Sequence, residues 1–252
     1  MEPIFYLISG YGTSTTCWER WVANLKELAT IVTVEIPSAN DKSKIGKIRL
    51  DDYVNKIVES VSSEPGGKRD RRIVVAHSSG GIALLKAIEK VPSLFEGVDV
   101  ILLSSVSPKG VKLVFNFRVF LGFFTSMLKA FPVWGRPVRL DPVWMKWLLT
   151  DGETFSEAER NRVTSYFQPY VSGSMGVEML LNLDSLKVNI DKVTKTIGRI
   201  IVINARDDKF GDTKKLAQRF NSLYVETAGS HFSYFAGTQV DKIIGFIKKI
   251  HL

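Results

Sequence analysis

The sequence predicts an α/β fold with a mostly parallel, doubly wound sheet and a long helical segment inserted between two of its strands. Three observations predict this fold. Short runs of apolar, largely β-branched residues recur along the chain, helical patterns lie between them, and one long interval contains no such run. The runs are apolar throughout rather than at every second position, which is typical of strands buried on both faces of a parallel sheet. The alternation of strands and helices indicates right-handed crossover connections.

Six strands and five principal helices are expected. The strands are predicted at residues 4–8, 31–36, 73–76, 98–103, 200–203 and 223–225. The helices are predicted at residues 18–28, 50–61, 82–88, 213–220 and 240–250, where apolar residues recur at helical spacing. Two pairs, Ser156 with Glu159 and Thr238 with Asp241, have the spacing of a capping box and therefore mark helix starts.

The interval without a predicted strand covers residues 108–193. Its helical patterns are split by Pro132, Pro137, Pro142 and Pro169. A segment of this length is too long to be a plain loop in a compact domain. We therefore expect a helical cap, formed by residues 108–193, on a core formed by residues 1–107 and 194–252.

The composition limits the classes to which the protein can belong. The chain has 252 residues, of which 45% are hydrophobic and 24% charged, so it is not a disordered or low-complexity sequence. Its one cysteine, Cys17, excludes an intrachain disulfide and a multi-cysteine zinc site. The sequence contains no phosphate-binding glycine loop, dinucleotide fingerprint or metal-ligand cluster. We therefore expect neither a cofactor nor a metal.

The chain is strongly basic. It has 34 Lys and Arg against 26 Asp and Glu, which gives a net charge of +8. These charges are scattered, apart from short runs at residues 68–72 and 248–249, and no nucleic-acid-binding motif accompanies them. We expect no nucleic-acid partner.

The sequence shows no secretory leader and no apolar run of the roughly 20 residues that a membrane-spanning helix needs. We expect a cytoplasmic protein.

The most informative motif for chemistry is the turn Ala76-His77-Ser78-Ser79-Gly80. A buried strand runs into a small-x-Ser-x-Gly turn and then into a helix, which is the context that a nucleophile elbow requires. The main-chain amide of Ser79 would begin the helix and point at a developing oxyanion. The alternative is an ordinary Ser- and Gly-rich turn at the end of a strand.

A nucleophilic serine needs a histidine base and an acid that orients the base, in the chain order serine, acid, histidine. His231 follows the last predicted strand, whereas His251 is the penultimate residue, where fraying is expected. His77 lies within the elbow itself, and we expect its ring to point away from the nucleophile and to bond structurally. The acid is Asp207 or Asp208, which together follow the strand at 200–203.

A second oxyanion donor is expected from the loop after the first strand. Gly10 and Gly12 give this loop the freedom to turn its amides inward, and the main-chain amide of Tyr11 is the candidate donor.

These four segments resemble those of the α/β-hydrolase superfamily, in particular the capped serine hydrolases described as esterases or lysophospholipase-like proteins. The resemblance implies an α/β-hydrolase fold and a catalytic triad of Ser78, Asp208 and His231, because the family's spacing favours Asp208 over Asp207. The family's first loop usually begins His-Gly, whereas here it begins Ser9-Gly10. A serine at the elbow argues against epoxide hydrolases and haloalkane dehalogenases of this fold, which use an aspartate there.

The predicted cap gives the main information about substrate. Residues 111–150 contain nine of the 27 aromatic residues of the chain, together with six Lys or Arg and one acidic residue. These aromatic residues either pack the cap's own helices or roof an apolar pocket for an acyl group. The basic rim of the cap is also a candidate for peripheral contact with lipid. The expected substrate-binding side chains are Trp18, Phe120, Phe124, Trp144 and Trp147.

We therefore expect a serine esterase that cleaves carboxylic esters with an apolar acyl or alcohol part. Thioesterase, lactonase and carbon–carbon bond hydrolase activities remain open on the same residues. The alternative from a different class is a ligand-binding or sensor protein that has this fold but little or no turnover. The sequence gives no indication of the oligomeric state.

Overall fold

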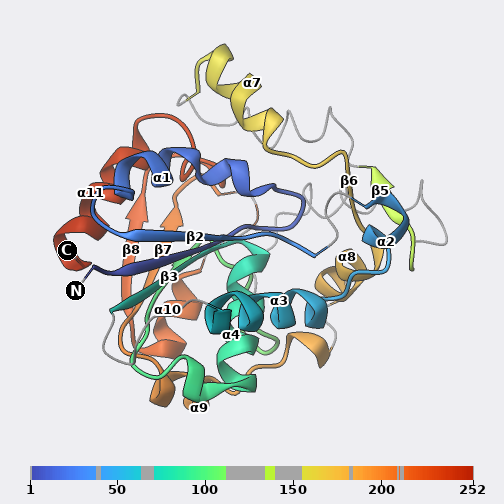
Figure 1. Cartoon of the computed structure of the whole chain (residues 1–252), viewed down its shortest axis with the longest axis horizontal. Helices are drawn as coiled ribbons and strands as arrows, with labels where there is room; N and C mark the ends of the chain where they lie inside the picture. The colour runs from blue at the N-terminus through green and yellow to red at the C-terminus, as the bar shows by residue number, and fades with distance from the viewer. Residues whose placement is uncertain are drawn as a thin grey trace.

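A computed structural model describes residues 2–37, 41–63, 71–111, 134–139, 155–181, 184–208, 210 and 213–251. Its main feature is a six-stranded sheet in the order β2-β1-β3-β4-β7-β8, in which every neighbouring pair is parallel (Figure 1). All six predicted strands are confirmed. Their bounds are β1 (Ile4–Ile8), β2 (Thr30–Val34), β3 (Arg72–His77), β4 (Asp99–Leu103), β7 (Ile200–Ala205) and β8 (Leu223–Thr227).

The five predicted helices are also present. They are α1 (Glu19–Leu25), α3 (Leu50–Ser63), α4 (Ser79–Lys90), α10 (Lys214–Phe220) and α11 (Gln239–His251). Two short helices that the sequence did not single out are α2 (Lys42–Ile45) and α9 (Ile190–Thr196). Single 3₁₀ turns are found at Thr15–Trp18, Pro92–Leu94 and Asp184–Leu186.

Helices cover both faces of the sheet, as the doubly wound prediction requires. Along β1, Tyr6 belongs to a buried cluster with residues of α3, α4 and α10, whereas Phe5 and Leu7 belong to a second cluster with residues of α1 and α11. Successive side chains of a strand point to opposite faces, so each central strand contributes to both clusters. Figure 1 shows α1 and α11 on one side of the sheet and α3, α4, α9 and α10 on the other.

The described parts of residues 108–193 contain two strands, so our expectation that this interval has none is wrong. The strands β5 (Pro137–Arg139) and β6 (Tyr170–Ser172) pair antiparallel in a small separate sheet. Three residues are too few to show the alternating pattern by which a strand is recognised, and Pro137 is tolerated because it occupies the first position of its strand. The interval also contains α7 (Glu157–Ser165), which the predicted capping box of Ser156 and Glu159 begins, and α8 (Gly173–Leu180).

Described residues from the later part of this interval pack into the core. Met175, Leu186 and Val193 belong to the same buried cluster as residues of α3 and α4. The division into a core (1–107 and 194–252) and a cap (108–193) stays a prediction, and we refer below to residues 108–193 as the insertion.

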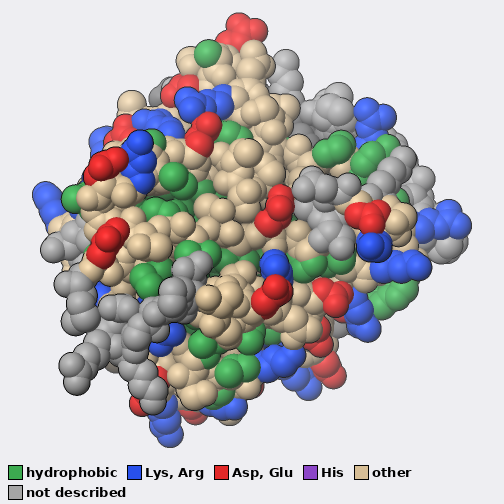
Figure 2. All heavy atoms as spheres, viewed as in Figure 1, with side chains coloured by type: hydrophobic (Ala, Val, Ile, Leu, Met, Phe, Trp, Pro, Cys, Tyr) green, Lys and Arg blue, Asp and Glu red, His purple; other side chains and the backbone are tan. Residues whose placement is uncertain are grey.

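The charged side chains are intermixed over the surface. On the face shown in Figure 2, Lys and Arg lie among Asp and Glu, as the scattered charges of the sequence indicated. Within the described ranges, no helix is both long enough and apolar enough to cross a membrane.

Candidate active site

Ser78 occupies the turn between the buried strand β3 and helix α4, as predicted. Its backbone has φ 54° and ψ −123°, and a positive φ is unfavourable for a residue with a side chain. Two main-chain hydrogen bonds hold the turn against the end of β4. The Ser78 amide donates to the Leu103 carbonyl at 3.0 Å, and the Val106 amide donates to the Ser78 carbonyl at 2.9 Å. The strain is therefore maintained by the surrounding backbone.

The small residues around Ser78 allow three chain segments to meet. A Cβ atom on Gly80 would lie 2.4 Å from the Ser9 carbonyl oxygen, so the start of α4 lies directly against the end of β1. A Cβ atom on Gly10 would lie 2.9 Å from the Ser78 Cβ atom. The loop after β1 therefore runs directly beside the predicted nucleophile.

The two predicted oxyanion donors belong to the two chain segments next to Ser78. Ser79 is the first residue of α4, where main-chain amides have no carbonyl within the helix and share the positive end of its dipole. Tyr11 directly follows Gly10 in the loop beside Ser78.

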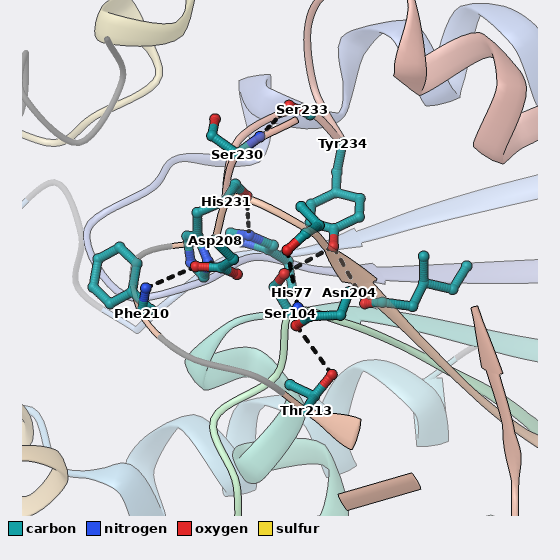
Figure 3. A network of polar contacts seen from close by, with 12 residues as sticks. His77, Ser104, Asn204, Asp208, Phe210, Thr213, Ser230, His231, Ser233 and Tyr234 are labelled. Carbon is teal, nitrogen blue, oxygen red and sulfur yellow. Dashed lines mark hydrogen bonds and ion pairs between the residues drawn. The ribbon is translucent and has the colours of Figure 1, made fainter. Parts of the chain in front are cut away.

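His231 and Asp208 form a buried pair (Figure 3). The His231 Nδ1 atom lies 2.8 Å from the Asp208 Oδ2 atom, and the two side chains are 5% and 1% exposed. The other oxygen of Asp208 accepts a hydrogen bond from the Phe210 amide at 2.8 Å. Asp207 is exposed. Of the two acids that the sequence left open, the structure brings Asp208 to the histidine.

The loops that carry the pair are joined through their main chains. The Asp207 amide donates to the Gly229 carbonyl at 3.0 Å, which links the turn after β7 to the turn after β8. Gly229 has φ 101°, and a Cβ atom there would lie 2.2 Å from the Ser233 Oγ atom. That hydroxyl accepts a hydrogen bond from the Ser230 amide at 2.8 Å, which fixes the residue before His231.

His77 connects the elbow to the histidine turn. Its Nε2 atom lies 2.9 Å from the His231 carbonyl oxygen, and the two ring centroids are 4.5 Å apart. A carbonyl only accepts, so the Nε2 atom of His77 carries the proton and donates it. Burial above all, and the electrostatic interaction with the ring of His231, hold the pKa of His77 well below its usual range. The expectation that this histidine bonds structurally is confirmed, whereas its partner could not be inferred from the sequence.

The side chain of Tyr11 has a contact that the sequence also did not indicate. Its hydroxyl donates a hydrogen bond to the Ser172 carbonyl in β6. Burial raises the pKa of this phenol, so the hydroxyl keeps its proton at neutral pH. The loop beside Ser78 is thus attached to the insertion.

The predicted substrate-binding residues have different outcomes. Trp18 is fully buried in the core, donates from its Nε1 atom to the Ser9 Oγ atom at 3.1 Å and packs edge-on against Phe235. These contacts show that it packs the loop after β1, and its role in binding substrate stays a prediction. The remaining four, Phe120, Phe124, Trp144 and Trp147, lie outside the described residues.

Two aromatic side chains lie near the predicted base. The ring of Phe210 is 4.3 Å from that of His231 between centroids, and the ring of Phe232 is 5.1 Å away. In the part of the chain that the structure describes, no group of three or more His, Cys, Asp or Glu could hold a metal ion.

Comparisons with known proteins agree with this architecture. A model of the alpha/beta hydrolase family matches residues 5–241. Methylesterase 17 of Arabidopsis thaliana is 30% identical over 94 residues, which cover 36% of this chain and 33% of that protein, so the match spans a third of the relative's length.

Solved structures match over nearly the whole chain at low sequence identity. An extracellular α/β-hydrolase from a Paenibacillus species superimposes with a TM-score of 0.74 at 15% identity, covering 98% of both chains. Tomato methylketone synthase I, in complex with 2-tridecanone, gives a TM-score of 0.70 at 16% identity, covering 99% of this chain and 98% of that one. These likenesses concern the fold. Because the family model covers most of the sequence, the chain belongs to the α/β-hydrolase family.

Proposed function

We propose that this protein is a serine esterase in which Ser78 is the nucleophile, His231 the general base and Asp208 the acid that orients it. The observation that carries the proposal is the contact between the elbow and the buried acid–histidine pair. His77, the neighbour of Ser78, bonds the main chain of His231 at 2.9 Å, while the ring of His231 bonds Asp208 at 2.8 Å. This contact supports our assignment of the strained turn at Ser78 and the His231–Asp208 pair to one site.

The hydrogen bond to Asp208 assigns the two nitrogens of His231 their roles. A carboxylate accepts, so Nδ1 carries the proton, and in the neutral ring Nε2 is left as the base. Nε2 takes the proton of the Ser78 hydroxyl as Oγ attacks the ester carbonyl carbon. The main-chain amides of Tyr11 and Ser79 donate to the oxyanion that forms. Asp208 stabilises the imidazolium without itself taking the proton.

The same groups complete the reaction in reverse order. The protonated His231 gives its proton to the leaving alcohol as the carbon–oxygen bond of the ester breaks, which leaves an acyl group on Ser78. Water then enters, His231 takes one of its protons, and the hydroxide attacks the acyl carbonyl. Collapse of the second oxyanion releases the carboxylic acid and returns the proton to Ser78.

The substrate that we propose is a carboxylic ester with an apolar acyl or alcohol part. The rings of Phe210 and Phe232 beside His231 support it, as does the aromatic-rich sequence of the insertion. Among similar proteins, one is named a methylesterase and another was solved with the long-chain ketone 2-tridecanone, which is consistent with ester chemistry near an apolar chain.

The test is a series of p-nitrophenyl esters from acetyl to dodecanoyl, measured with the wild type and with Ser78→Ala. Each methylene that enters an apolar pocket contributes roughly 0.8 kcal/mol, or about fourfold in kcat/KM, so efficiency rises over several carbons before it levels off. Ser78→Ala abolishes turnover, whereas Ser79→Ala loses far less because its main-chain amide is retained. A folded wild type that binds these esters but turns them over no faster than Ser78→Ala would instead be a ligand-binding protein.

A further inference from the structure

The loop that runs beside Ser78 is paired with the insertion along three successive residues. The Ser14 amide donates to the Tyr166 carbonyl at 2.8 Å, and the Gln168 amide donates to the Gly12 carbonyl at 2.8 Å. Between these two hydrogen bonds, Thr13 and Phe167 form an antiparallel bridge. The insertion therefore contributes part of the support of a loop that belongs to the sheet core.

The hydroxyl of Tyr11 adds a further attachment, closer to Ser78. It donates to the main-chain carbonyl of Ser172, at the end of β6. Ser172 is itself held firmly, because β6 pairs with β5 and because the Ser172 Oγ atom accepts from the Met175 amide at 3.2 Å and donates to the Ile48 carbonyl. Tyr11 thus bonds to a carbonyl whose position is fixed by both the insertion and the segment before α3.

On its other side, Tyr11 is joined to the residue that contacts the nucleophile. Gly10 lies so close to Ser78 that a Cβ atom would be 2.9 Å from the Ser78 Cβ atom. The Thr13 side chain closes the loop by donating to the Gly10 carbonyl at 2.8 Å. The peptide unit between Gly10 and Tyr11 is therefore held from both directions, and that unit carries the Tyr11 amide.

We propose that Tyr11 is a positioning residue whose hydroxyl, bound to the Ser172 carbonyl, orients its own main-chain amide toward the oxyanion formed at Ser78. This inference rests on the proposed esterase function. It makes β6 of the insertion a part of the support of the oxyanion site, in addition to any contact that the insertion makes with substrate. An interaction of this kind acts in the transition state, where the charge develops, and contributes little to binding of the neutral ester.

The test compares Tyr11→Phe with Tyr166→Phe. Each substitution removes one phenolic hydroxyl that joins the insertion to the core, since the Tyr166 hydroxyl donates to Glu19 of α1. Removing a donor from an oxyanion site lowers kcat about 10²–10³-fold. Tyr11→Phe keeps the main-chain donor and removes only the hydrogen bond that orients it, so the fall in kcat should be smaller. We expect kcat/KM for p-nitrophenyl acetate to fall about tenfold in Tyr11→Phe with KM within about twofold. Tyr166→Phe stays close to the wild type.

A trifluoromethyl ketone inhibitor separates positioning from a general loss of structure. Ser78 adds to its carbonyl carbon, the serine proton passes to His231, and the resulting oxyanion occupies the same site as in the reaction. The inhibition constant rises in Tyr11→Phe by the same factor by which kcat/KM falls. Inhibition by the corresponding trifluoromethyl alcohol, which is neutral and cannot form this adduct, is unchanged.

Equal kcat/KM in Tyr11→Phe and the wild type overturns the proposal, as does a fall in kcat/KM without a matching rise in the inhibition constant. If Tyr11→Phe does not fold, Thr13→Val decides, because it removes the side-chain hydrogen bond to the Gly10 carbonyl and leaves only that of the Thr13 main-chain amide at 3.2 Å, so it should show smaller paired changes of the same kind. A wild type that is no more active than Ser78→Ala refutes the esterase function itself, and this proposal with it. An active wild type with unaffected loop variants refutes only the role of Tyr11.

Discussion

The carboxylate of Asp208 accepts a hydrogen bond from the ring of His231 at 2.8 Å, between residues that are 23 positions apart in the sequence. Both side chains are almost fully buried, at 1% and 5% exposed. Asp207, the immediate neighbour of Asp208, is exposed and instead uses its main-chain amide to bond Gly229. Two adjacent acids that the sequence hardly distinguishes therefore have different roles, one on the histidine ring and one on the loop.

This difference predicts that Asp208→Asn lowers kcat for ester hydrolysis far more than Asp207→Asn does. An amide at position 208 can donate to the ring and so hold the wrong tautomer of His231, and in serine proteases the equivalent change lowers kcat about 10⁴-fold. We expect a loss of about 10³–10⁴ in kcat for Asp208→Asn and at most about threefold for Asp207→Asn. Steady-state kinetics with p-nitrophenyl butyrate measure both, and thermal unfolding verifies that both variants fold. The reverse ranking would move the acid to residue 207.

The contact between Gly10 and Ser78 predicts that a single methyl group impairs the site. In Gly10→Ala the new Cβ atom would meet the Ser78 Cβ atom at 2.9 Å and the His77 Nδ1 atom at 3.0 Å, so the loop has to move away from the elbow. Because the Tyr11 amide moves with it, we expect kcat/KM to fall at least about 100-fold. Kinetics on p-nitrophenyl acetate measure this loss.

The matched control is Gly245→Ala in helix α11. A Cβ atom there meets nothing within 4 Å, and alanine is about 1 kcal/mol more favourable than glycine in a helix interior. This variant should keep wild-type kinetics and unfold at the same or a higher temperature. Wild-type kinetics in Gly10→Ala would show that the loop does not need its close approach to Ser78.

The buried ring of His77 predicts a pH dependence of stability. Burial above all, and the electrostatic interaction with the ring of His231, hold the pKa of His77 well below its usual value near 6.5. Below pH 6.5 the unfolded chain therefore binds a proton that the folded protein does not, and the free energy of unfolding falls as the pH is lowered. One such group contributes a slope of up to about 1.4 kcal/mol per pH unit to the free energy of unfolding. This slope persists as the pH is lowered until it reaches the pKa of His77 in the folded protein.

Denaturant unfolding of the wild type and of His77→Gln between pH 5 and pH 8 tests this. Glutamine does not titrate, and its amide can still donate toward the His231 carbonyl, so the variant loses this component of the slope. Other groups titrate in both proteins, and the difference between the two profiles isolates His77. Identical slopes below pH 6.5 would mean that His77 takes up its proton equally readily in the folded state.

The sheet and the main site residues could be predicted because their patterns are local. Each central strand contains a continuous apolar run, and the elbow at Ser78 is a short motif with a fixed place between strand and helix. The order of the acid and the histidine along the chain then limits the candidates to few residues. These inferences need no knowledge of which segments meet in space.

The small sheet of β5 and β6 and the partners of Tyr11 and His77 could not be predicted, because they depend on contacts between segments that are distant in the sequence. β5 and β6 are three residues long and form because they pair with each other, so neither has a pattern of its own. The bond from the Tyr11 hydroxyl to Ser172 spans 161 positions, and the bond from His77 to His231 spans 154. A tyrosine in a glycine loop and a histidine before the serine gave no indication of these partners. The burial of Trp18 in the core was likewise not evident from its place in the sequence, next to a predicted site.

The most direct test of the account is the position at which a fluorophosphonate probe attaches to the protein. The probe forms a covalent bond to an activated serine oxygen with loss of fluoride, and peptide mass spectrometry locates the modified residue. We predict one adduct per chain, on Ser78, formed at least about 10³-fold more slowly in His231→Ala, because the serine then lacks its base. An adduct on another serine, or no adduct on the folded wild type, would contradict the account.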